Sequence, residues 1–463
     1  MGQKGSAMVR TAGVLSLILA SAAAAGVAAL RAPRRPPVPP ADPPAATSRE
    51  GALQLSVRLD RRWLDSRGGA SYLEIGVAAD GMPERGPRTA VNAVLVIDRS
   101  GSMSGEKIAR ARDAARALIA ALDGEDRLAI VDFASDAHLL LASAQVTPAF
   151  KEVALAQVSR LQATSGTNLS AALDLAAPQL ERGRAPSRLD KVFLATDGLA
   201  NEGVSDRAGL LRIAARDFGR ATVSTFGIGE DYDEDLLAAL AAQGGGRTRF
   251  IHSASELEPA MRAELTRAAR TVARDVRLEV RGSSGTRVVR VLGYGADGGS
   301  IRLPDFAAGE ERRVLVKLSV APAAEGEGEV ARVALSFADP AGAAHNSETV
   351  ARGSFTAKAA LLGMRANDAL AHGARAELAE LARDAAEMKG DGRAEEARQR
   401  VDEMQVLLRS VTAAAPPAAM PALEKEAKDY KIGLAGIRGG GDVPSKRVKQ
   451  QAFDSLRAPV SGW

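Results

Sequence analysis

The stretch VLVIDRSGSMSGEKI, residues 94–108, runs from an apolar segment of strand length directly into an aspartate, three serines and two glycines. Further apolar segments of strand length, RLAIVDF, KVFLATD and TVSTFGIG, follow it, and segments with the spacing of amphipathic helices separate them. Strands that are apolar throughout and alternate with helices are typical of a mainly parallel sheet covered on both faces. We therefore expect residues 90–270 to form one doubly wound α/β domain.

Segments in which apolar and polar residues alternate flank this domain. Within residues 50–80, LQLSVRLD and YLEIGV predict short strands, and residues 272–357, with VRLEV, RRVLVKLSV and VARVALSF, predict a β-sandwich. The early strands cannot bury a face alone, so we expect them to pack with this sandwich and the α/β domain to be inserted between its parts. Helical spacing predicts a helical hairpin over residues 358–412, and residues 413–463 are expected to be a flexible basic tail.

The N-terminal segment has the features of an export signal. Lys4 and Arg10 precede an uncharged and mostly apolar run, after which residues 32–49 form a Pro-rich linker. Residues 1–31 therefore predict a signal peptide or a membrane anchor. Small residues favour a cleaved signal, whereas the length of the run and the arginines after it favour a retained anchor that would attach the chain to a membrane. Both alternatives predict an extracytoplasmic protein, periplasmic or at the cell envelope, either membrane-anchored or secreted.

The composition excludes several classes of function. The net charge is only +4 with 25% charged residues, and the arginines are spread along the chain, so we expect no nucleic-acid partner. The sequence has no cysteine, which excludes disulfides, thiolate metal sites and thiol nucleophiles. Aromatic residues make up 3% of the chain, too few for the stacking surfaces that bind single-stranded nucleic acids.

Oxygen-bearing side chains follow the ends of several predicted strands. In a doubly wound sheet, ligands bind beyond the carboxyl ends of the strands. Asp98, Ser100 and Ser102 lie in the first strand-to-helix loop, Thr167 lies in the loop of ATSGTNLSAAL, and Asp197 ends the segment KVFLATD. Hydroxyl and carboxylate oxygens without histidine or sulfur suit a small hard dication, above all Mg²⁺, with Mn²⁺ or Ca²⁺ as substitutes.

With these residues the chain resembles the von Willebrand factor A (VWA) domain family. The metal-ion-dependent adhesion site (MIDAS) of that family has the pattern Asp-x-Ser-x-Ser followed by a distant threonine and a distant aspartate. Asp98, Ser100 and Ser102 fit the first element, Thr167 in SGTNL fits the second, and Asp197 in ATDG fits the third. The order of the flanking segments is also similar to that of exported bacterial proteins that carry such a domain.

The resemblance implies how the site works. It implies that the two serines bind the metal directly, that the threonine binds directly or through water, and that the aspartates often act through water. One coordination position stays open for a carboxylate of a partner protein. The neighbouring residues are then expected to contact that partner: Gly101, Met103, Ser165, Gly166, Asn168 and Gly198.

Single residues of these loops also have simpler interpretations. Ser104 is expected to cap the helix that begins near Gly105, and Thr167 taken alone could cap the helix that follows it. Asp197 taken alone could start a turn with Gly198. The acidic residues 231–235 are expected to lie at a helix N-terminus and not at a metal site.

Enzymatic motifs are missing from the sequence. In GSMSG, residues 101–105, Met103 stands where a nucleophile elbow requires serine, and Ser100 stands where an aspartyl phosphotransferase usually has its second acid. We therefore expect a non-enzymatic exported protein that binds Mg²⁺ and uses it to bind an acidic group of a partner protein at the cell envelope. The alternatives are an envelope scaffold or assembly protein with a structural metal, or a Mg²⁺-dependent hydrolase.

Overall fold

The computed structural model describes residues 45–81, 88–219, 221–229, 232–251, 253–283, 285–294, 300–364, 366–412, 414–437 and 443–457. The predicted signal or anchor, residues 1–31, lies outside the described residues. Within the part of the chain that the structure describes, no helix combines the length and the apolar character needed to span a lipid bilayer.

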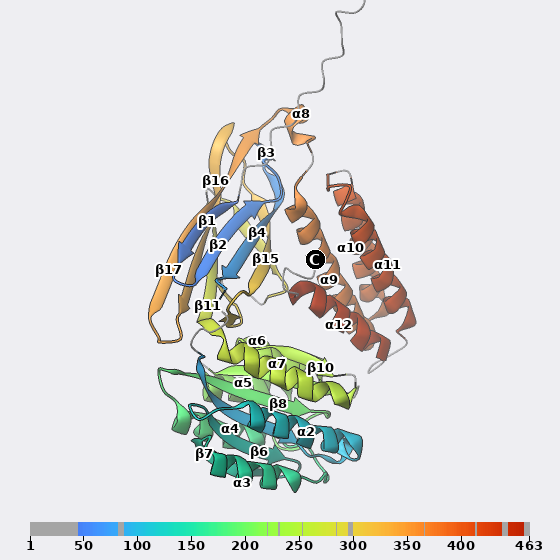
Figure 1. Cartoon of the computed structure of the whole chain (residues 1–463). Helices are drawn as coiled ribbons and strands as arrows, with labels where there is room; N and C mark the ends of the chain where they lie inside the picture. Colours follow the sequence, from blue (N-terminus) through green and yellow to red (C-terminus); the bar gives the residue numbers. More distant parts are fainter. Residues whose placement is uncertain are drawn as a thin grey trace, which may run out of the picture. The chain divides into compact units, whose positions relative to one another are not determined.

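A mainly parallel sheet forms the centre of the α/β domain (Figure 1). Its strand order is β10-β9-β8-β5-β6-β7, in which the edge strand β7 alone pairs antiparallel with its neighbour. The strands are β5 (Ala90–Asp98), β6 (Arg127–Phe133), β7 (Ala137–Gln145), β8 (Arg188–Thr196), β9 (Thr222–Ile228) and β10 (Thr248–Ile251). The prediction of a doubly wound, mainly parallel sheet is confirmed.

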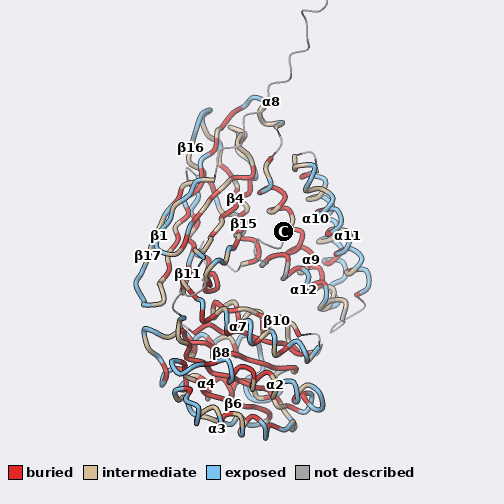
Figure 2. Tube along the Cα trace, viewed as in Figure 1, coloured by how far each residue is buried: buried red, intermediate tan, exposed pale blue. Residues whose placement is uncertain are grey.

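Helices cover both faces of this sheet because its central strands are apolar on both sides. On β5, Val91, Leu95 and Ile97 point into one core and Val94 and Val96 into the other. Figure 2 shows the resulting concentration of buried residues along the strands. The first core is closed by α2 (Glu106–Ala121), α3 (Pro148–Ser159) and α7 (Leu257–Ala269), and the second by α4 (Leu169–Gly183), α5 (Arg207–Phe218) and α6 (Glu234–Gln243).

Two antiparallel sheets with a shared apolar core form the β-sandwich. The first has the order β1-β2-β4-β15-β12, with β1 (Ala46–Glu50), β2 (Leu53–Leu59), β4 (Gly69–Ala79), β15 (Glu311–Val320) and β12 (Arg287–Leu292). The second has the order β13-β11-β16-β17-β3, with β13 (Ser300–Arg302), β11 (Thr271–Gly282), β16 (Gly326–Ala338), β17 (Ala344–Thr356) and the parallel strand β3 (Trp63–Asp65), and β14 (Phe306–Ala307) also pairs with β11. The first sheet therefore combines strands from before and after the α/β domain.

The expected boundary of the Pro-rich linker at residue 49 is wrong. Residues 46–50 form strand β1, which pairs antiparallel with β2 from Ala46 opposite Val57 to Glu50 opposite Leu53. The physical reason is that Leu53, Leu55 and Val57 make β2 a buried strand whose outer edge offers free backbone groups to the preceding segment.

A buried ionic cluster lies where the α/β domain continues into the sandwich. Lys191 of β8 donates to Glu264 of α7 over 2.6 Å, and both side chains are almost completely buried. Arg267, also on α7, donates to the same carboxylate over 3.0 Å, and Ser224 of β9 donates to it over 2.8 Å. Burial would raise the pKa of Glu264, but Arg267 and Lys191 lower it well below its ordinary value.

The C-terminal region forms a helical bundle: the hairpin predicted over residues 358–412 is present, and two further helices pack with it where a flexible tail was expected. Its helices are α8 (Ala359–Leu362), α9 (Asp368–Gly390), α10 (Ala394–Thr412), α11 (Met420–Gly436) and α12 (Val443–Arg457). The expected flexible tail over residues 413–463 is therefore wrong for the described part of α11 and α12. These two helices contribute buried apolar side chains to one core with α9: Leu423, Tyr430, Leu434, Val448, Ala452 and Leu456.

Candidate metal centre

Asp98 ends β5 and is completely buried at the carboxyl edge of the sheet. One of its carboxylate oxygens accepts a hydrogen bond from the backbone N–H of Ser100 over 2.7 Å, and the other accepts from the hydroxyl of Thr196. Burial raises the pKa of Asp98 above its ordinary value. Both oxygens are therefore occupied by donors of the chain, so Asp98 acts by holding the first loop in place.

The loop after Asp98 forms a short 3-10 helix, Gly101–Met103, which points two serine hydroxyls in one direction. The hydroxyl oxygens of Ser100 and Ser102 are 3.1 Å apart. Met103 is completely buried in the apolar core of the domain, so its expected contact with a partner is wrong. This apolar side chain, five residues after the end of β5, fixes the loop to the core of the domain.

The predicted cap of α2 is also wrong. Gly105 occupies the N-cap position and Ser104 donates its hydroxyl to the carbonyl of Gly101 over 2.7 Å. Ser104 therefore closes the 3-10 turn, whereas Glu106 supplies negative charge in the first turn of α2.

Thr167 is buried in the loop before α4, and its backbone is held from both sides. Its N–H donates to the side chain of Asn201 over 2.9 Å, and its carbonyl accepts from the backbone N–H of Asn201 over 3.0 Å. This loop is tied to the first one because the N–H of Thr164 donates to the carbonyl of Arg99 over 2.7 Å. Thr167 therefore presents its hydroxyl from a fixed backbone and does not cap α4.

Asn168 and Gly166 have structural roles in the same loop. Asn168 is the N-cap of α4, where its side-chain oxygen accepts from the N–H of Ala171 over 3.1 Å, so its expected partner contact is replaced by a cap. Gly166 has φ +80, and an added Cβ would collide with Ser135 and Glu202. The loop can therefore take this path because residue 166 is glycine.

Asp197 follows β8 and is completely buried, with both carboxylate oxygens in use. Oδ1 accepts from the hydroxyl of Ser102 over 2.7 Å. Oδ2 accepts from the Nζ of Lys107, in the first turns of α2, over 2.5 Å. Asp197 therefore connects a predicted ligand hydroxyl with a cationic side chain that the sequence interpretation did not include.

The three predicted hydroxyls converge on one point, the backbone of Gly198. A Cβ atom built on Gly198 would lie 3.5 Å from Ser102 Oγ, 3.6 Å from Thr167 Oγ1 and 3.8 Å from Ser100 Oγ. Residues that are far apart in the sequence are thus brought together at the ends of β5 and β8, with Asp98 and Asp197 behind the hydroxyls. The structure assembles all five predicted site residues at one sheet edge.

This donor set fits a small hard dication. Among the described residues, no three or more histidine, aspartate or glutamate side chains gather in a way that would hold a metal ion. A cation at this sheet edge would therefore depend on the three neutral hydroxyls, with the two carboxylates supplying negative charge from behind. Oxygen donors of this kind suit Mg²⁺, which also retains water readily on positions that the protein leaves open.

The rim of the site combines exposed and half-buried residues. Gly101 and Ser165 are exposed, whereas Gly166 and Gly198 are half-buried. Ser135 donates its hydroxyl to the carbonyl of Ser165 and to the carboxylate of Glu202, over 2.9 Å in both cases. Of the residues expected to face a partner, the two that are fully accessible are thus Gly101 and Ser165.

The sequence placed Thr196 at the same sheet edge without assigning it a role in the site, and the supporting residues Asn201 and Lys107 were not predicted. Thr196 and Asn201 belong to the segment ATDGLAN that already contains Asp197, so their polar side chains beside a predicted ligand were an available signal. Lys107 gave no such signal, because a lysine in the first turns of an amphipathic helix usually faces solvent.

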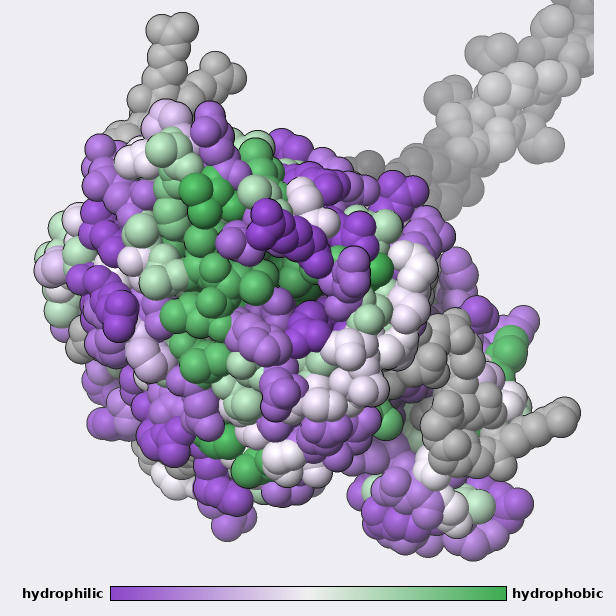
Figure 3. All heavy atoms as spheres, turned by 90° about the horizontal axis from the view of Figure 1, so that it is seen from below, coloured by the Kyte–Doolittle hydropathy of each residue, from purple (hydrophilic) through white to green (hydrophobic). Residues whose placement is uncertain are grey.

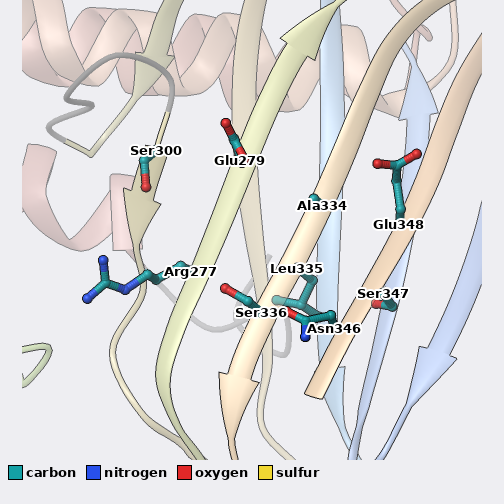
Figure 4. Close-up of a pocket in the computed structure, with 9 residues that line it drawn as sticks. All are labelled: Arg277, Glu279, Ser300, Ala334, Leu335, Ser336, Asn346, Ser347 and Glu348. Atoms are coloured by element: carbon teal, nitrogen blue, oxygen red, sulfur yellow. The ribbon is translucent and has the colours of Figure 1, made fainter. Parts of the chain in front are cut away.

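A second hollow, of about 460 Å³, lies on the outer face of the sandwich (Figure 4). It is lined by Arg277, Glu279, Ser300, Ala334, Leu335, Ser336, Asn346, Ser347 and Glu348. Its carboxylates pair with arginines on the same sheet, Glu279 with Arg281 over 2.6 Å and Glu348 with Arg332 over 3.2 Å. The two carboxylates are thus paired with exposed arginines of the same sheet.

An apolar area is visible on the face of the molecule shown in Figure 3, among polar surroundings. Among the described residues of the α/β domain, the large apolar side chains that are exposed are those of Leu139, Val153, Leu199 and Val204. Of these, Leu199 directly follows Gly198, on which the three hydroxyls converge.

Comparison with known proteins identifies the α/β domain. Residues 91–250 match the family described as von Willebrand factor type A domain, so this part of the chain is a VWA domain, a class that often mediates interactions between proteins. The chain is 33% identical over 207 residues to an uncharacterised protein of Synechocystis, covering 44% of this chain and 48% of that one. It is 31% identical over 209 residues to inter alpha-trypsin inhibitor heavy chain 4 of Mus musculus, covering 43% and 22% of the two chains. The chain thus spans half or less of the length of these relatives.

Solved structures share the fold over most of the chain. A von Willebrand factor type A protein from Catenulispora acidiphila superposes with a TM-score of 0.68 at 20% identity, covering 89% of this chain and 99% of that one. The ArnB paralog VWA2 from Sulfolobus acidocaldarius gives a TM-score of 0.53 at 16% identity, covering 88% and 98%. At these identities the likeness concerns the fold alone.

Proposed function

We propose that this protein is an exported, non-enzymatic VWA-domain protein that binds Mg²⁺ at a MIDAS and uses the metal to bind an acidic group of a partner protein at the cell envelope. The single observation that carries the proposal is the convergence of Ser100, Ser102 and Thr167 on Gly198, with two buried carboxylates behind them. The character of residues 1–31 supports the extracytoplasmic location.

The accessible hydroxyls and the buried carboxylates of the site would have different roles. Ser100, Ser102 and Thr167 would hold the cation, since their hydroxyls border the space beside Gly198. Asp98 and Asp197 position these hydroxyls, because Asp98 fixes the backbone of Ser100 and Asp197 accepts from Ser102. When bound, Mg²⁺ supplies positive charge and an exchangeable coordination position that a carboxylate can occupy.

Replacing Asp98 with alanine is expected to abolish stabilisation by Mg²⁺. The change removes negative charge and releases the N–H of Ser100, so the first hydroxyl is no longer fixed. A protein that binds a ligand only when folded gains about 2.7 kcal/mol at a free ligand concentration about 100 times Kd. Thermal unfolding of residues 45–463 in Mg²⁺ and in EDTA measures this gain as a rise in Tm for the wild type and none for the variant.

The matched control for this experiment is Asp174→Ala, an exposed aspartate of α4 that lies away from the hydroxyl cluster. It should keep the Mg²⁺-dependent rise in Tm. An equal rise in Asp98→Ala and wild type would contradict the proposed site, and no rise in the wild type at millimolar Mg²⁺ would favour a scaffold without a functional metal.

Replacing Gly198 with alanine is expected to remove cation binding while the fold persists. The new methyl group would touch all three hydroxyls at ordinary van der Waals distance, 3.5–3.8 Å, and would occupy the space that they border. The backbone of Gly198 does not have positive φ, so alanine is tolerated there. Calorimetric titration with Mg²⁺ should show affinity reduced at least about tenfold, equivalent to about 1.4 kcal/mol.

Gly124→Ala is the control, because an added Cβ on Gly124 meets open space. That variant should bind Mg²⁺ as the wild type does. Unchanged affinity in Gly198→Ala would show that the cation does not sit among the three hydroxyls.

A further inference from the structure

Lys107 places a positive charge directly behind the candidate cation site. Its Nζ lies 2.5 Å from Asp197 Oδ2, while Asp197 Oδ1 accepts from the ligand hydroxyl of Ser102. The side chain of Lys107 is 27% exposed, whereas that of Asp197 is completely buried. The ammonium group thus reaches from solvent to a buried carboxylate that belongs to the site.

The Lys107 side chain also lies against Gly229, at the end of a different strand. A Cβ atom built on Gly229, which follows β9, would lie 3.4 Å from both Cε and Nζ of Lys107. The N–H of Gly229 donates to the carbonyl of Ile251 over 2.8 Å, so this backbone is held in place. Lys107 is therefore seated between Asp197 and a fixed main-chain segment.

The charged side chains around the candidate cation site determine its net charge. Directly behind the hydroxyls, which are neutral, Asp98 and Asp197 contribute two negative charges and Lys107 contributes one positive charge. The carboxylate of Glu202 lies at the rim, where it accepts from Ser135, and is not counted in this inner group. The neighbouring Arg99 is paired with Asp132 over 2.6 Å and adds no net charge. A dication would change the balance of this group from −1 to +1, and a carboxylate ligand would bring it to zero.

We propose that Lys107 is an internal counter-cation that weakens metal binding in the absence of an anionic ligand and thereby couples the two binding events. This inference rests on the proposed function and identifies a regulating residue of the same site. A fixed ammonium group opposes an incoming dication at short range, where charges interact strongly in a partly buried environment. A carboxylate that binds the metal relieves the excess positive charge, so each ligand raises the affinity for the other by the same factor.

The competing interpretation is that Lys107 merely satisfies the buried charge of Asp197. In that case its removal would leave an unpaired buried carboxylate and disorder the hydroxyl of Ser102, so Mg²⁺ affinity would fall. The two interpretations predict opposite changes in affinity.

The test is calorimetric titration of the EDTA-treated and dialysed full chain with Mg²⁺, for wild type, Lys107→Met and Lys107→Gln. Lys107→Gln removes the charge but retains a hydrogen-bond donor for Asp197. It therefore still tests the inference if Lys107→Met does not fold. Arg110→Met, an exposed position on the same helix, is the matched control. Each titration is run in sodium chloride and in sodium acetate at equal ionic strength, with acetate as the carboxylate probe.

In chloride, both Lys107 variants should bind Mg²⁺ about tenfold more tightly than the wild type, because a fixed repulsive charge is removed. Acetate should tighten Mg²⁺ binding in the wild type and in Arg110→Met and have a smaller effect in the Lys107 variants. Equal or weaker Mg²⁺ binding by folded Lys107 variants would overturn the inference while leaving the cation site intact. Absence of Mg²⁺ binding in all four proteins would instead overturn the proposed function, and this inference with it.

Discussion

Replacing Glu264 with glutamine is expected to lower the free energy of unfolding by about 3 to 5 kcal/mol, the usual cost of removing one partner from a buried ion pair. Glu264 is the shared acceptor of Lys191, over 2.6 Å, and of Arg267, over 3.0 Å. Burial lowers the pKa of Lys191 to about 8 even though the carboxylate opposes this shift. Without that carboxylate, two buried cations would face each other with less compensating negative charge.

Urea unfolding of wild type and Glu264→Gln measures this loss. The control is Glu258→Gln on the same helix, where an exposed carboxylate pairs with Arg262 over 2.9 Å. Exposed pairs of this kind contribute about 0.5 kcal/mol or less, so the control should unfold almost as the wild type does. Similar midpoints for the two variants would show that the buried cluster does not stabilise the junction between the α/β domain and the sandwich.

The double variant Lys191→Met/Glu264→Gln measures how much of the stability loss comes from this ion pair. If the loss in Glu264→Gln comes from an unpaired lysine, removing that lysine should restore part of the stability. With the single change Lys191→Met completing the cycle, Arg267 is present in every variant, so the coupling energy reports on the pair of residues that are changed.

The α/β domain was predictable because its signal is local. Strands such as NAVLVID are apolar on both faces, which a sheet covered by helices requires and a half-exposed sheet does not. The five site residues were predictable for a related reason: parallel strands bring the loops after β5 and β8 to one edge, so polar residues distant in sequence meet there. Their metal-binding role stays a prediction.

Features that depend on tertiary partners were not predictable in this way. The segment that contains Leu423, Tyr430 and Leu434 interleaves apolar residues with charged ones, and its apolar side chains form a core because α9 supplies the opposing face. Lys107 is 90 positions away from Asp197 in the sequence, so no local sequence pattern predicts their ion pair. Met103 was expected to contact a partner because it neighbours the predicted ligand Ser102, whereas its apolar side chain fills the core beneath the loop.

The second large effect is expected from removal of residues before 88, which include β1, β2, β3 and β4. Strand β4 pairs along ten positions with β15, from Gly69 opposite Val320 to Ala78 opposite Glu311. Without it, β15 and β12 would lose most of their sheet, and the buried residues Leu73, Ile75 and Val77 would leave the sandwich core. A chain of residues 88–463 should therefore not fold its sandwich.

The α/β domain should survive the same truncation, because its two apolar cores are built from residues that follow position 88. Differential scanning calorimetry of residues 45–463 and 88–463 should show loss of the sandwich transition, with a separate transition retained for the α/β domain. Adding a peptide of residues 45–81 should restore the missing transition if β2 and β4 can pair with β15 in trans. Full retention of both transitions in the shorter chain would mean that the strands after the α/β domain form a stable sandwich by themselves, and the α/β domain would then not be an insertion within it.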